Sequence, residues 1–225
     1  MRIVVTAGPT REHLDPVRFL SNPSTGKMGF AIAAEAARRG HDVTLVAGPV
    51  SLKTPKGVCR VDVTSAREML TRSLEGLGSL EGLGSLEGLE KVVFISTAAV
   101  ADWRPATCAK FKLKKGQMSG VLKLVRNPDI LKTIHSTIRR FGESTIRLVG
   151  FAAETNDVLK EAARKCREKG LSFIVANDVT RKGCGFGTDT NKVTFVFPDG
   201  TQKELPLMTK RRVARKILEE IENEV

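Results

Sequence analysis

Short apolar runs alternate with helical patterns along most of this chain, and that alternation restricts its fold more than any other feature. Six runs rich in Val, Ile and Leu are typical of buried strands. Strands that are apolar on both faces belong in parallel sheets covered by helices. We therefore predict an α/β fold, a three-layer Rossmann-like doubly wound, mostly parallel sheet. The predicted strands are 2–6, 43–47, 59–63, 92–97, 147–151 and 172–176, and the predicted helices are 26–39, 65–75, 128–139 and 157–169.

Two stretches interrupt the alternation, and we predict that both are β-hairpins added to the sheet. Residues 110–125 are basic and carry KGQMSG at the expected tip, which suits a lid. Residues 192–206 contain an Asp-Gly turn signal between two strand patterns. A last amphipathic helix is expected over 208–224. A chain of 225 residues can form one large domain, and we expect a single domain over 1–225.

The sequence SLEGLGSLEGLGSLEGLE, residues 73–90, repeats one hexad three times. A period of six residues suits neither a helix nor a strand, and solenoid repeats are longer, with about 20 residues or more. We interpret this segment as an expanded connector without a functional role, which leads into the strand at 92.

The composition limits the partners and the location of the protein. Lys and Arg number 37 and Asp and Glu 25, so the net charge of +12 attracts anions, whether nucleotides, phosphorylated metabolites or nucleic acid. The four cysteines form no C-x-x-C pair, which indicates neither a zinc site nor a disulfide framework. No signal peptide pattern and no apolar run of roughly 20 residues is present. We expect a cytoplasmic protein without membrane partners.

The sequence SNPSTGKMGF places a Gly-Lys pair before a predicted helix, but it departs from the phosphate-binding loop of nucleoside triphosphatases. That loop needs Gly at the position of Ser21 and Ser or Thr at the position of Met28. Ser24 or Thr25 could still cap the helix, and Gly26 would let an anion approach its free N–H groups. The alternative is an ordinary capped helix whose glycines pack on the sheet.

Two segments with charged side chains lie near predicted strand ends, one with an aspartate and one with several lysines. In STAAVADWRP, small residues leave the backbone open and Asp102 follows the strand, which suits ribose or metal binding; close packing is the alternative. In KFKLKK, strand alternation would place Lys110, Lys112 and Lys114 on one face. The alternative for this run is a charged edge strand that prevents aggregation.

Two later segments show the same arrangement of polar residues beside strands and helix ends. In RNPDIL, Asn127 precedes Pro128 and Asp129 at a helix start, where a plain N-cap is the alternative. In the segment that begins GFAAET, Lys165 and Lys169 lie one helical turn apart on one face.

Seven motifs follow one another in a specific order: TAGPT, DPVRFLSNPSTGKMG, AAVADWRP, KLKK, NPDIL, GFAAET and ANDV. In these motifs the chain resembles phosphopantothenate–cysteine ligase, also called phosphopantothenoylcysteine synthetase, of the bacterial and archaeal CTP-dependent type. The resemblance covers nearly the whole chain. It implies an enzyme of coenzyme A biosynthesis that joins 4′-phosphopantothenate to L-cysteine. CTP converts the carboxylate to an acyl-cytidylate with release of pyrophosphate, and the cysteine amino group then displaces CMP.

The resemblance also implies roles for individual residues. Asn22 and Lys112 would be catalytic, and the substrate 4′-phosphopantothenate would contact Arg18, Asn22, Ala98 and Asp102. The chain would form a homodimer, in which Arg18 of one subunit would reach the site of the other. The nucleotide site would comprise Ser24, Thr25, Gly26, Ser96, Thr97, Ala98, Asp102, Lys112, Asn127, Pro128, Asp129, Ile130, Phe151, Lys165 and Lys169.

The same resemblance sets the expected cofactors and partners. Mg²⁺ would be held mainly by the nucleotide phosphates, and no flavin is expected on this chain. A separate phosphopantothenoylcysteine decarboxylase is a further partner, since the chain is either a free-standing ligase or an excised part of a fusion. The sequence departs from the family at Pro23, where Arg is common, and at Thr25, where Ser is common. Pro23 removes one backbone donor near the expected phosphates.

Two other classes of protein fit less well. A Rossmann-type oxidoreductase needs G-x-G-x-x-G after the first strand, where this chain has TAGPTRE, and its GCGFG lies far downstream. A nucleic-acid-binding module would combine its positive charge with aromatic side chains, but Tyr is absent and Trp occurs once. We expect no nucleic-acid partner.

Overall fold

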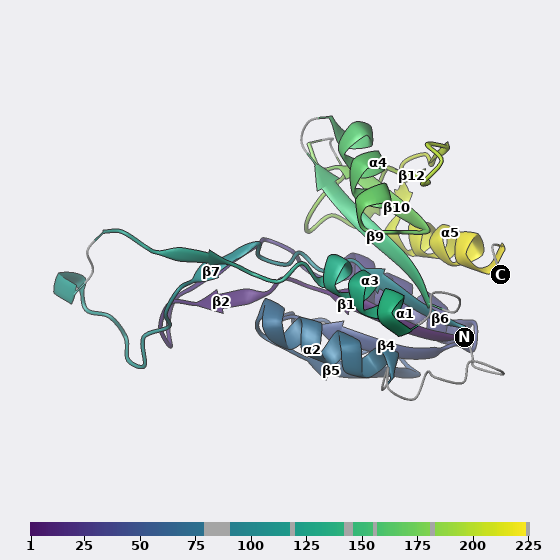
Figure 1. Ribbon diagram of the computed structural model, residues 1–225. Coiled ribbons are helices and arrows are strands. Elements are labelled where there is room, and N and C mark those ends of the chain that lie inside the picture. Colours follow the sequence, from purple (N-terminus) through teal and green to yellow (C-terminus); the bar gives the residue numbers. More distant parts are fainter. Residues whose placement is uncertain (79–90, 118–119, 142–145, 155–156, 181–182, 224–225) are drawn as a thin grey trace.

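An eight-stranded sheet forms the centre of the computed structural model, which describes residues 1–78, 91–117, 120–141, 146–154, 157–180 and 183–223 (Figure 1). The strands lie in the order β13-β12-β10-β9-β6-β1-β4-β5. Those from β10 to β5 are parallel, and β12 and β13 are antiparallel additions. Their bounds are β1 (Arg2–Ala7), β4 (Asp42–Ala47), β5 (Val58–Asp62), β6 (Val92–Ser96), β9 (Ile146–Glu154), β10 (Phe173–Asp178), β12 (Val193–Val196) and β13 (Gln202–Glu204).

The order of the parallel strands defines where a ligand can bind. When the six parallel strands are numbered by their order in the chain, their order across the sheet from β5 to β10 is 3-2-1-4-5-6. This is the order of doubly wound dinucleotide-binding folds, and it confirms the predicted sheet. The connections change direction between β1 and β6, so the carboxyl ends of these two strands border a crevice, and such crevices hold ligands.

Helices cover both faces of the sheet and complete three layers. Alternate residues of a strand point to opposite faces, so Ile3 and Val5 pack with α1 and α5, whereas Val4 packs on the side of α2, α3 and α4. All three side chains are fully buried, and each such burial contributes about 1.5–3 kcal/mol. The helices are α1 (Lys27–Arg38), α2 (Ala66–Leu77), α3 (Ile130–Phe141), α4 (Val158–Glu168) and α5 (Lys210–Asn223).

The predicted hairpin over 192–206 is confirmed, because β12 and β13 pair antiparallel and extend the sheet beyond β10. A short pair beside it, β11 (Thr190–Asn191) and β14 (Met208–Thr209), leads into α5. None of the helices in the described ranges is both long enough and apolar enough to cross a membrane.

The hexad repeat is only partly a connector. Its first five residues form the end of α2, where Ser73 and Leu77 are buried, and Gly78 ends the helix with a positive φ of 99°. The prediction that the connector begins at 73 is therefore wrong: Ser73 and Leu77, four residues apart, lie on one helix face, and here that face meets the core. Residues 79–90 lie outside the described residues.

Removing one hexad, residues 79–84, should leave activity within a few-fold of the original. Gly78 and Lys91, the described residues on either side of the segment, both lie close to Arg2. The Arg2 N–H donates to the Lys91 carbonyl over 3.1 Å, and a Cβ at Gly78 would lie 3.3 Å from the Arg2 guanidinium. A shorter loop can therefore join them, and each halving of loop length changes the closure free energy by only about 0.6 kcal/mol. Pyrophosphate release measures the effect. A folded but inactive deletion variant would show that the repeat has a function.

The basic segment 110–125 is not a hairpin, which corrects a second prediction. Its described part contains a 3₁₀ turn, Lys115–Gln117, and a strand only at its end, β8 (Leu124–Arg126), which pairs with β7 (Trp103–Pro105). The sequence alternates, but Phe111 is 77% exposed, so no apolar face holds these residues in a strand. Lys110, Lys112 and Lys114 consequently do not share a strand face.

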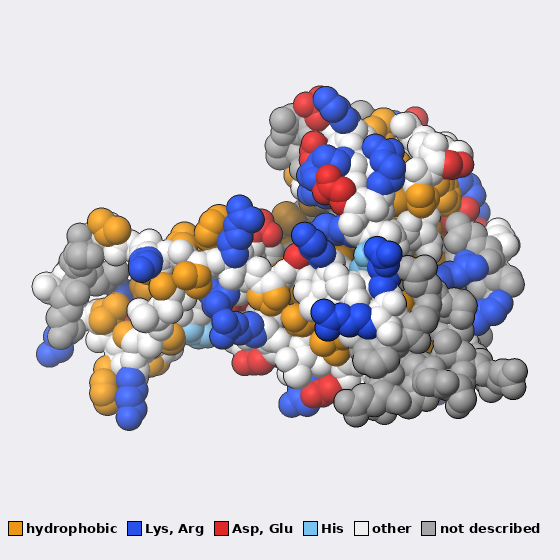
Figure 2. All heavy atoms as spheres, in the orientation of Figure 1, with side chains coloured by type: hydrophobic (Ala, Val, Ile, Leu, Met, Phe, Trp, Pro, Cys, Tyr) orange, Lys and Arg blue, Asp and Glu red, His pale blue; other side chains and the backbone are white. Residues whose placement is uncertain are grey.

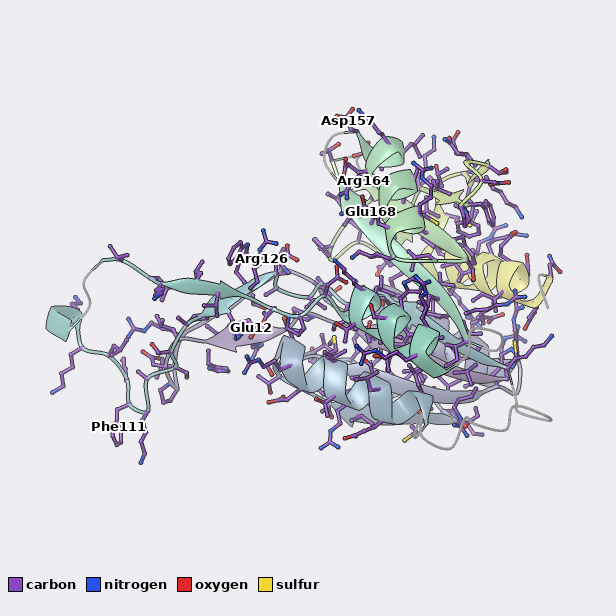
Figure 3. All side chains as sticks on the ribbon, in the orientation of Figure 1. Glu12, Phe111, Arg126, Asp157, Arg164 and Glu168 are labelled. Atoms are coloured by element: carbon purple, nitrogen blue, oxygen red, sulfur yellow. The ribbon has the colours of Figure 1, made fainter. Side chains whose placement is uncertain are left out.

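An unpredicted hairpin, β2 (Arg11–His13) with β3 (Phe19–Ser21), lies beside β7. We call residues 11–21, 103–117 and 120–126 the arm; it projects away from the sheet and helices (Figure 1). The root of the arm is fixed to the core by Glu12, which is 4% exposed and whose Oε1 accepts a 2.9 Å hydrogen bond from the Ala66 N–H at the start of α2 (Figure 3).

Candidate functional site

The loop that follows β6 is fixed to the loop that follows β1, at the crevice where the strand order reverses. The Thr97 hydroxyl donates to the Thr6 carbonyl over 2.6 Å, and the Ala99 N–H donates to the Gly8 carbonyl over 2.9 Å. The Ala101 N–H donates to the Thr10 hydroxyl over 3.0 Å. These bonds hold the small residues of AAVAD open along the sheet edge and fix the positions of the polar groups beside them.

Asn22 is attached to this loop. Its Nδ2 donates to the carbonyls of Ala99 and Val100 over 3.1 and 3.2 Å. Because both amide hydrogens are used, the side chain has a fixed orientation, and no described residue donates a hydrogen bond to its Oδ1. This is the placement expected of a residue that orients a substrate at the crevice.

The N-terminus of α1 lies beside the same loop and is open to a ligand. Its N-cap is Gly26 with φ 76°, and no side chain caps it, so the prediction that Ser24 or Thr25 would do so is wrong. Ser24 Oγ instead accepts a 3.4 Å bond from the Gly26 N–H. A Cβ at Gly29 would lie 2.5 Å from Thr97 Oγ1, so only glycine permits this close approach. Free N–H groups at a helix N-terminus favour an anion.

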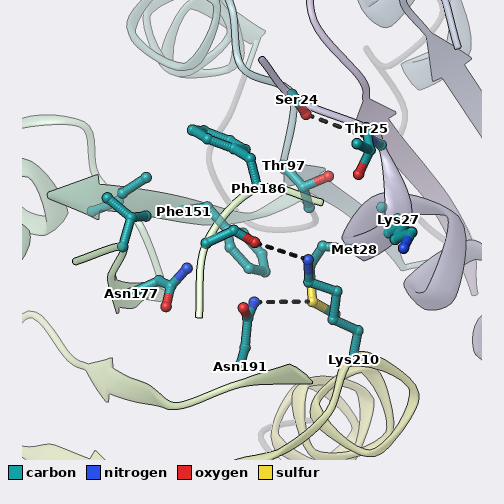
Figure 4. A pocket seen from close by; sticks show the side chains of 16 residues that line it. Ser24, Thr25, Lys27, Met28, Thr97, Phe151, Asn177, Phe186, Asn191 and Lys210 are labelled. Carbon is teal, nitrogen blue, oxygen red and sulfur yellow. Dashed lines mark hydrogen bonds between the residues drawn. The ribbon is translucent and has the colours of Figure 1, made fainter. Parts of the chain in front are cut away.

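A small cavity, which we call the inner cavity, lies between this helix end and the sheet (Figure 4). Its volume is about 70 Å³. The first turn of α1 forms one wall, and side chains from six other segments complete it: Thr97, Phe151, Asn177, Phe186, Asn191 and Lys210.

A larger hollow of about 350 Å³, the outer hollow, lies at the root of the arm. Asn127 fixes its floor, with the Nδ2 donating to the Ala101 carbonyl over 2.7 Å and the N–H donating to the Asp102 carbonyl over 2.8 Å. Asp129 accepts from the Lys132 N–H over 3.1 Å and pairs with Lys169 at 2.8 Å. Burial opposes ionisation, but these two donors outweigh it, so the pKa of Asp129 lies below its ordinary value.

The structure divides the predicted nucleotide residues between the two cavities. Ser24, Thr25, Gly26, Thr97 and Phe151 line the inner cavity. The outer hollow is lined by Asp102, Asn127, Pro128, Asp129 and Lys169. Ser96, Ala98, Ile130 and Lys165 line neither, and Ile130 is only 4% exposed because it packs in the core at the start of α3.

Lys112 and Arg18 both lie in the arm, in segments held together by one buried carboxylate. Asp15 is fully buried and pairs with Arg18 at 2.5 Å. The Leu113 N–H donates to Asp15 over 3.2 Å, and the Leu113 carbonyl accepts from Arg18 over 2.9 Å. The hydrogen bond from the Arg18 side chain has the largest effect in holding the pKa of Asp15 well below its ordinary range. Lys112, next to Leu113, is exposed.

Three polar residues of the inner cavity were missed by the sequence analysis: Asn177, Asn191 and Lys210. Each is less than a tenth exposed. The motif ANDV contains Asn177 at the end of β10, so its place at a strand end was a usable signal. Asn191 and Lys210 have no comparable local pattern, because a two-residue strand and a helix start place them here.

Among the described residues, no group of three or more His, Cys, Asp or Glu side chains could hold a metal ion.

Comparison with known proteins places this arrangement in a family. Residues 1–225 match the family described as DNA/pantothenate metabolism flavoprotein C-terminal domain. The coenzyme A biosynthesis bifunctional proteins CoaBC of Escherichia coli (strain K12) and Bacillus subtilis (strain 168) are each 46% identical, over 98% and 97% of this chain and 51% and 50% of theirs. The chain thus spans about half the length of the curated relatives it matches. The crystal structure of the C-terminal domain of a CoaBC is 42% identical with a TM-score of 0.77, covering 99% of this chain and 94% of that one.

Proposed function

Because the chain belongs to the family of the DNA/pantothenate metabolism flavoprotein C-terminal domain, we propose that it is a CTP-dependent phosphopantothenate–cysteine ligase of coenzyme A biosynthesis. One observation carries the proposal. The motifs AAVAD, NPDIL and SNPSTGKMG, which are far apart in the sequence, meet around the β1–β6 crevice with Asn22 bonded into the AAVAD loop.

The nucleotide would occupy the outer hollow, whose 350 Å³ falls within the usual range for a ligand pocket. Asp102 and the Asp129–Lys169 pair offer partners for the ribose and the phosphates. The phosphates would extend toward Ser24–Gly26 at the open N-terminus of α1, which favours negative charge. Mg²⁺ would enter with the nucleotide phosphates and offset part of their charge.

The reaction has two steps, and the residues at the crevice suit both. First, a carboxylate oxygen of 4′-phosphopantothenate bonds to the α-phosphorus of CTP, and the bond to pyrophosphate breaks. Asn22 would orient the acyl end, and Lys112 would stabilise the charge that develops. Second, the cysteine nitrogen bonds to the acyl carbon, the carbon–oxygen bond breaks with its electron pair going to CMP, and the amine proton passes to solvent.

A second copy of the chain is the partner that the arm fits. Most of the exposed large apolar side chains lie on it, and Figure 2 shows them interspersed with basic residues. Phe111, labelled in Figure 3, projects from the arm away from the sheet. Exposed apolar surface of this extent marks an interface. These residues are Val17, Phe19, Trp103, Phe111, Val121, Leu122 and Leu124.

The homodimer would bring the arm of one subunit to the crevice of the other. Arg18 would then reach the substrate phosphate of the neighbouring site, together with the segment that carries Lys112. The relatives named as bifunctional are about twice as long as this chain, so a separate phosphopantothenoylcysteine decarboxylase is a second proposed partner.

Pyrophosphate release tests the proposed function. The protein is mixed with 4′-phosphopantothenate and either CTP or ATP, with and without L-cysteine. We expect about one pyrophosphate per site without cysteine, because the acyl-cytidylate stays bound, and continuous release with cysteine, faster with CTP. An absence of release under all four conditions would overturn the proposal.

Trp103 should report nucleotide binding. This sole tryptophan lines the outer hollow, and the Arg126 guanidinium lies 5.3 Å from its ring centroid. A nucleotide in the hollow would change the environment of the ring, so CTP with Mg²⁺ should alter its fluorescence and NAD should not. A flat titration at millimolar CTP, with a folded protein, would contradict this placement.

A further inference from the structure

Asp15 connects the two segments of the arm that carry Arg18 and Lys112. Its Oδ1 accepts hydrogen bonds of 2.8 Å from the N–H groups of Val17 and Arg18, and so fixes the turn between β2 and β3. Its Oδ2 accepts from Arg18 Nε over 3.0 Å and from the Leu113 N–H over 3.2 Å. One carboxylate therefore orders the turn of the hairpin and attaches the basic segment to it.

The basic segment is held to this turn on both sides of Lys112. The Ala109 N–H donates to a carbonyl of the turn over 2.9 Å, and Arg18 Nη2 donates to the Leu113 carbonyl over 2.9 Å. Apolar packing contributes little here, since Phe111 is exposed and projects from the arm (Figure 3). The position of Lys112 consequently depends on polar contacts with the turn.

Arg18 can hold Asp15 and still contact a ligand, because its side chain is 36% exposed whereas that of Asp15 is fully buried. Its guanidinium is planar and rigid, and Nε and Nη2 face Asp15 and Leu113. A phosphate that binds the exposed part of this group would therefore restrict the movement of the whole guanidinium. The restriction would extend to Leu113 and to the neighbouring Lys112.

We propose that Asp15 is a positioning residue, which couples binding of the substrate phosphate by Arg18 to the placement of Lys112 at the α-phosphate of CTP. This inference rests on the proposed function, in which the arm brings both cations to the neighbouring subunit's site. Binding energy from a part of the substrate that does not react can in this way lower the barrier at the part that does. The 4′-phosphate would then raise the rate of acyl-cytidylate formation and not only the affinity.

The first test compares 4′-phosphopantothenate with pantothenate, which lacks the phosphate. It measures single-turnover pyrophosphate release with CTP and Mg²⁺ and without cysteine. At saturation, pantothenate should react about tenfold to a hundredfold more slowly, the range for losing hydrogen bonds to a charged group. Phosphite, added as a separate dianion, should restore part of this rate, because it can bind at Arg18 without a bond to pantothenate. Equal maximal rates for the two substrates, or no effect of phosphite, would overturn the inference.

Asp15→Asn tests the residue itself, since the amide keeps the shape of the side chain but loses the charge and one acceptor. The rate advantage of 4′-phosphopantothenate over pantothenate should fall by about tenfold, and the acceleration by phosphite should fall with it. Glu12→Gln is the matched control. Glu12 is another buried carboxylate of the same hairpin, but it bonds to the Ala66 N–H at the root of the arm (Figure 3). This control should keep both effects, and their loss in both variants would contradict a specific role of Asp15.

Hydrogen exchange at the Leu113 N–H needs no variant and therefore decides the question even if Asp15→Asn does not fold. In the unmodified protein, 4′-phosphopantothenate should slow this exchange more than pantothenate does, and an equal effect of the two would overturn the coupling. If the unmodified protein releases no pyrophosphate with 4′-phosphopantothenate and CTP, the proposed function itself fails. If release is normal but the two substrates reach the same maximal rate, the proposed function stands and only this inference fails.

Discussion

Lys112→Gln should slow formation of the acyl-cytidylate by about 10²–10³-fold, as expected for the loss of one preorganised group that stabilises developing charge. Glutamine keeps the length and a hydrogen-bond donor but removes the charge. Although Lys112 is not on a strand, the peptide next to it is fixed, since the N–H and the carbonyl of Leu113 bond to Asp15 and Arg18. Its backbone is thus positioned by the arm while its side chain stays exposed. Substrate affinity should change much less, because neighbouring lysines preserve the basic field.

Lys115→Gln is the matched control for this prediction. Lys115 is the last lysine of the same basic run and the first residue of the 3₁₀ turn Lys115–Gln117. We expect Lys115→Gln to slow acyl-cytidylate formation far less than Lys112→Gln does. The measurement is single-turnover formation of acyl-cytidylate and its conversion by cysteine, for both variants side by side. Equal and modest losses would mean that the run is a solvated basic patch and that Lys112 has no special role.

Arg18→Ala should destabilise the arm, because it breaks an ion pair whose carboxylate, Asp15, is fully buried while the Arg18 side chain is 36% exposed. Asp15 is fully buried, and without Arg18 its charge would be left with backbone N–H donors alone. Arg18 also holds the Leu113 carbonyl, so the loss should reach the segment of Lys112. Urea unfolding measures the stability, and we expect weaker dimerisation and a higher KM for 4′-phosphopantothenate, with CTP binding nearly intact.

A double variant separates the structural role of Arg18 from substrate binding. Asp15→Asn with Arg18→Ala removes both charges, so most of the stability should return. If Arg18 also binds the substrate phosphate, the KM for 4′-phosphopantothenate should stay high in the double variant. Full recovery of that KM would mean that Arg18 acts only through Asp15.

Mixing subunits tests whether Arg18 acts on the neighbouring site. Arg18→Ala and Asn22→Ala subunits, mixed in equal amounts and allowed to exchange, should regain about a quarter of the original activity, because half of the dimers are mixed and each has one intact site. No recovery in subunits shown to exchange would indicate that each site is built from a single chain.

The sequence by itself determined the central sheet and its layers. The burial of a strand or of a helix face leaves a local periodic pattern, and all six predicted parallel strands and all four helices between them exist within a few residues of their predicted ends. The ordered motifs also indicated which segments form the crevice, because loops after the carboxyl ends of parallel strands meet at one sheet edge.

Only the tertiary structure decided the arm and the division of the site into two cavities. Strand alternation in KFKLKK was real, but no apolar surface was available to bury one face of it, and Leu113 is held instead by Arg18, which is 95 residues away in the sequence. In the same way, Asn177, Asn191 and Lys210 converge on the inner cavity from a strand end, a two-residue strand and a helix start. Contacts between residues so far apart depend on how the elements pack in space, and local sequence patterns carry no record of them.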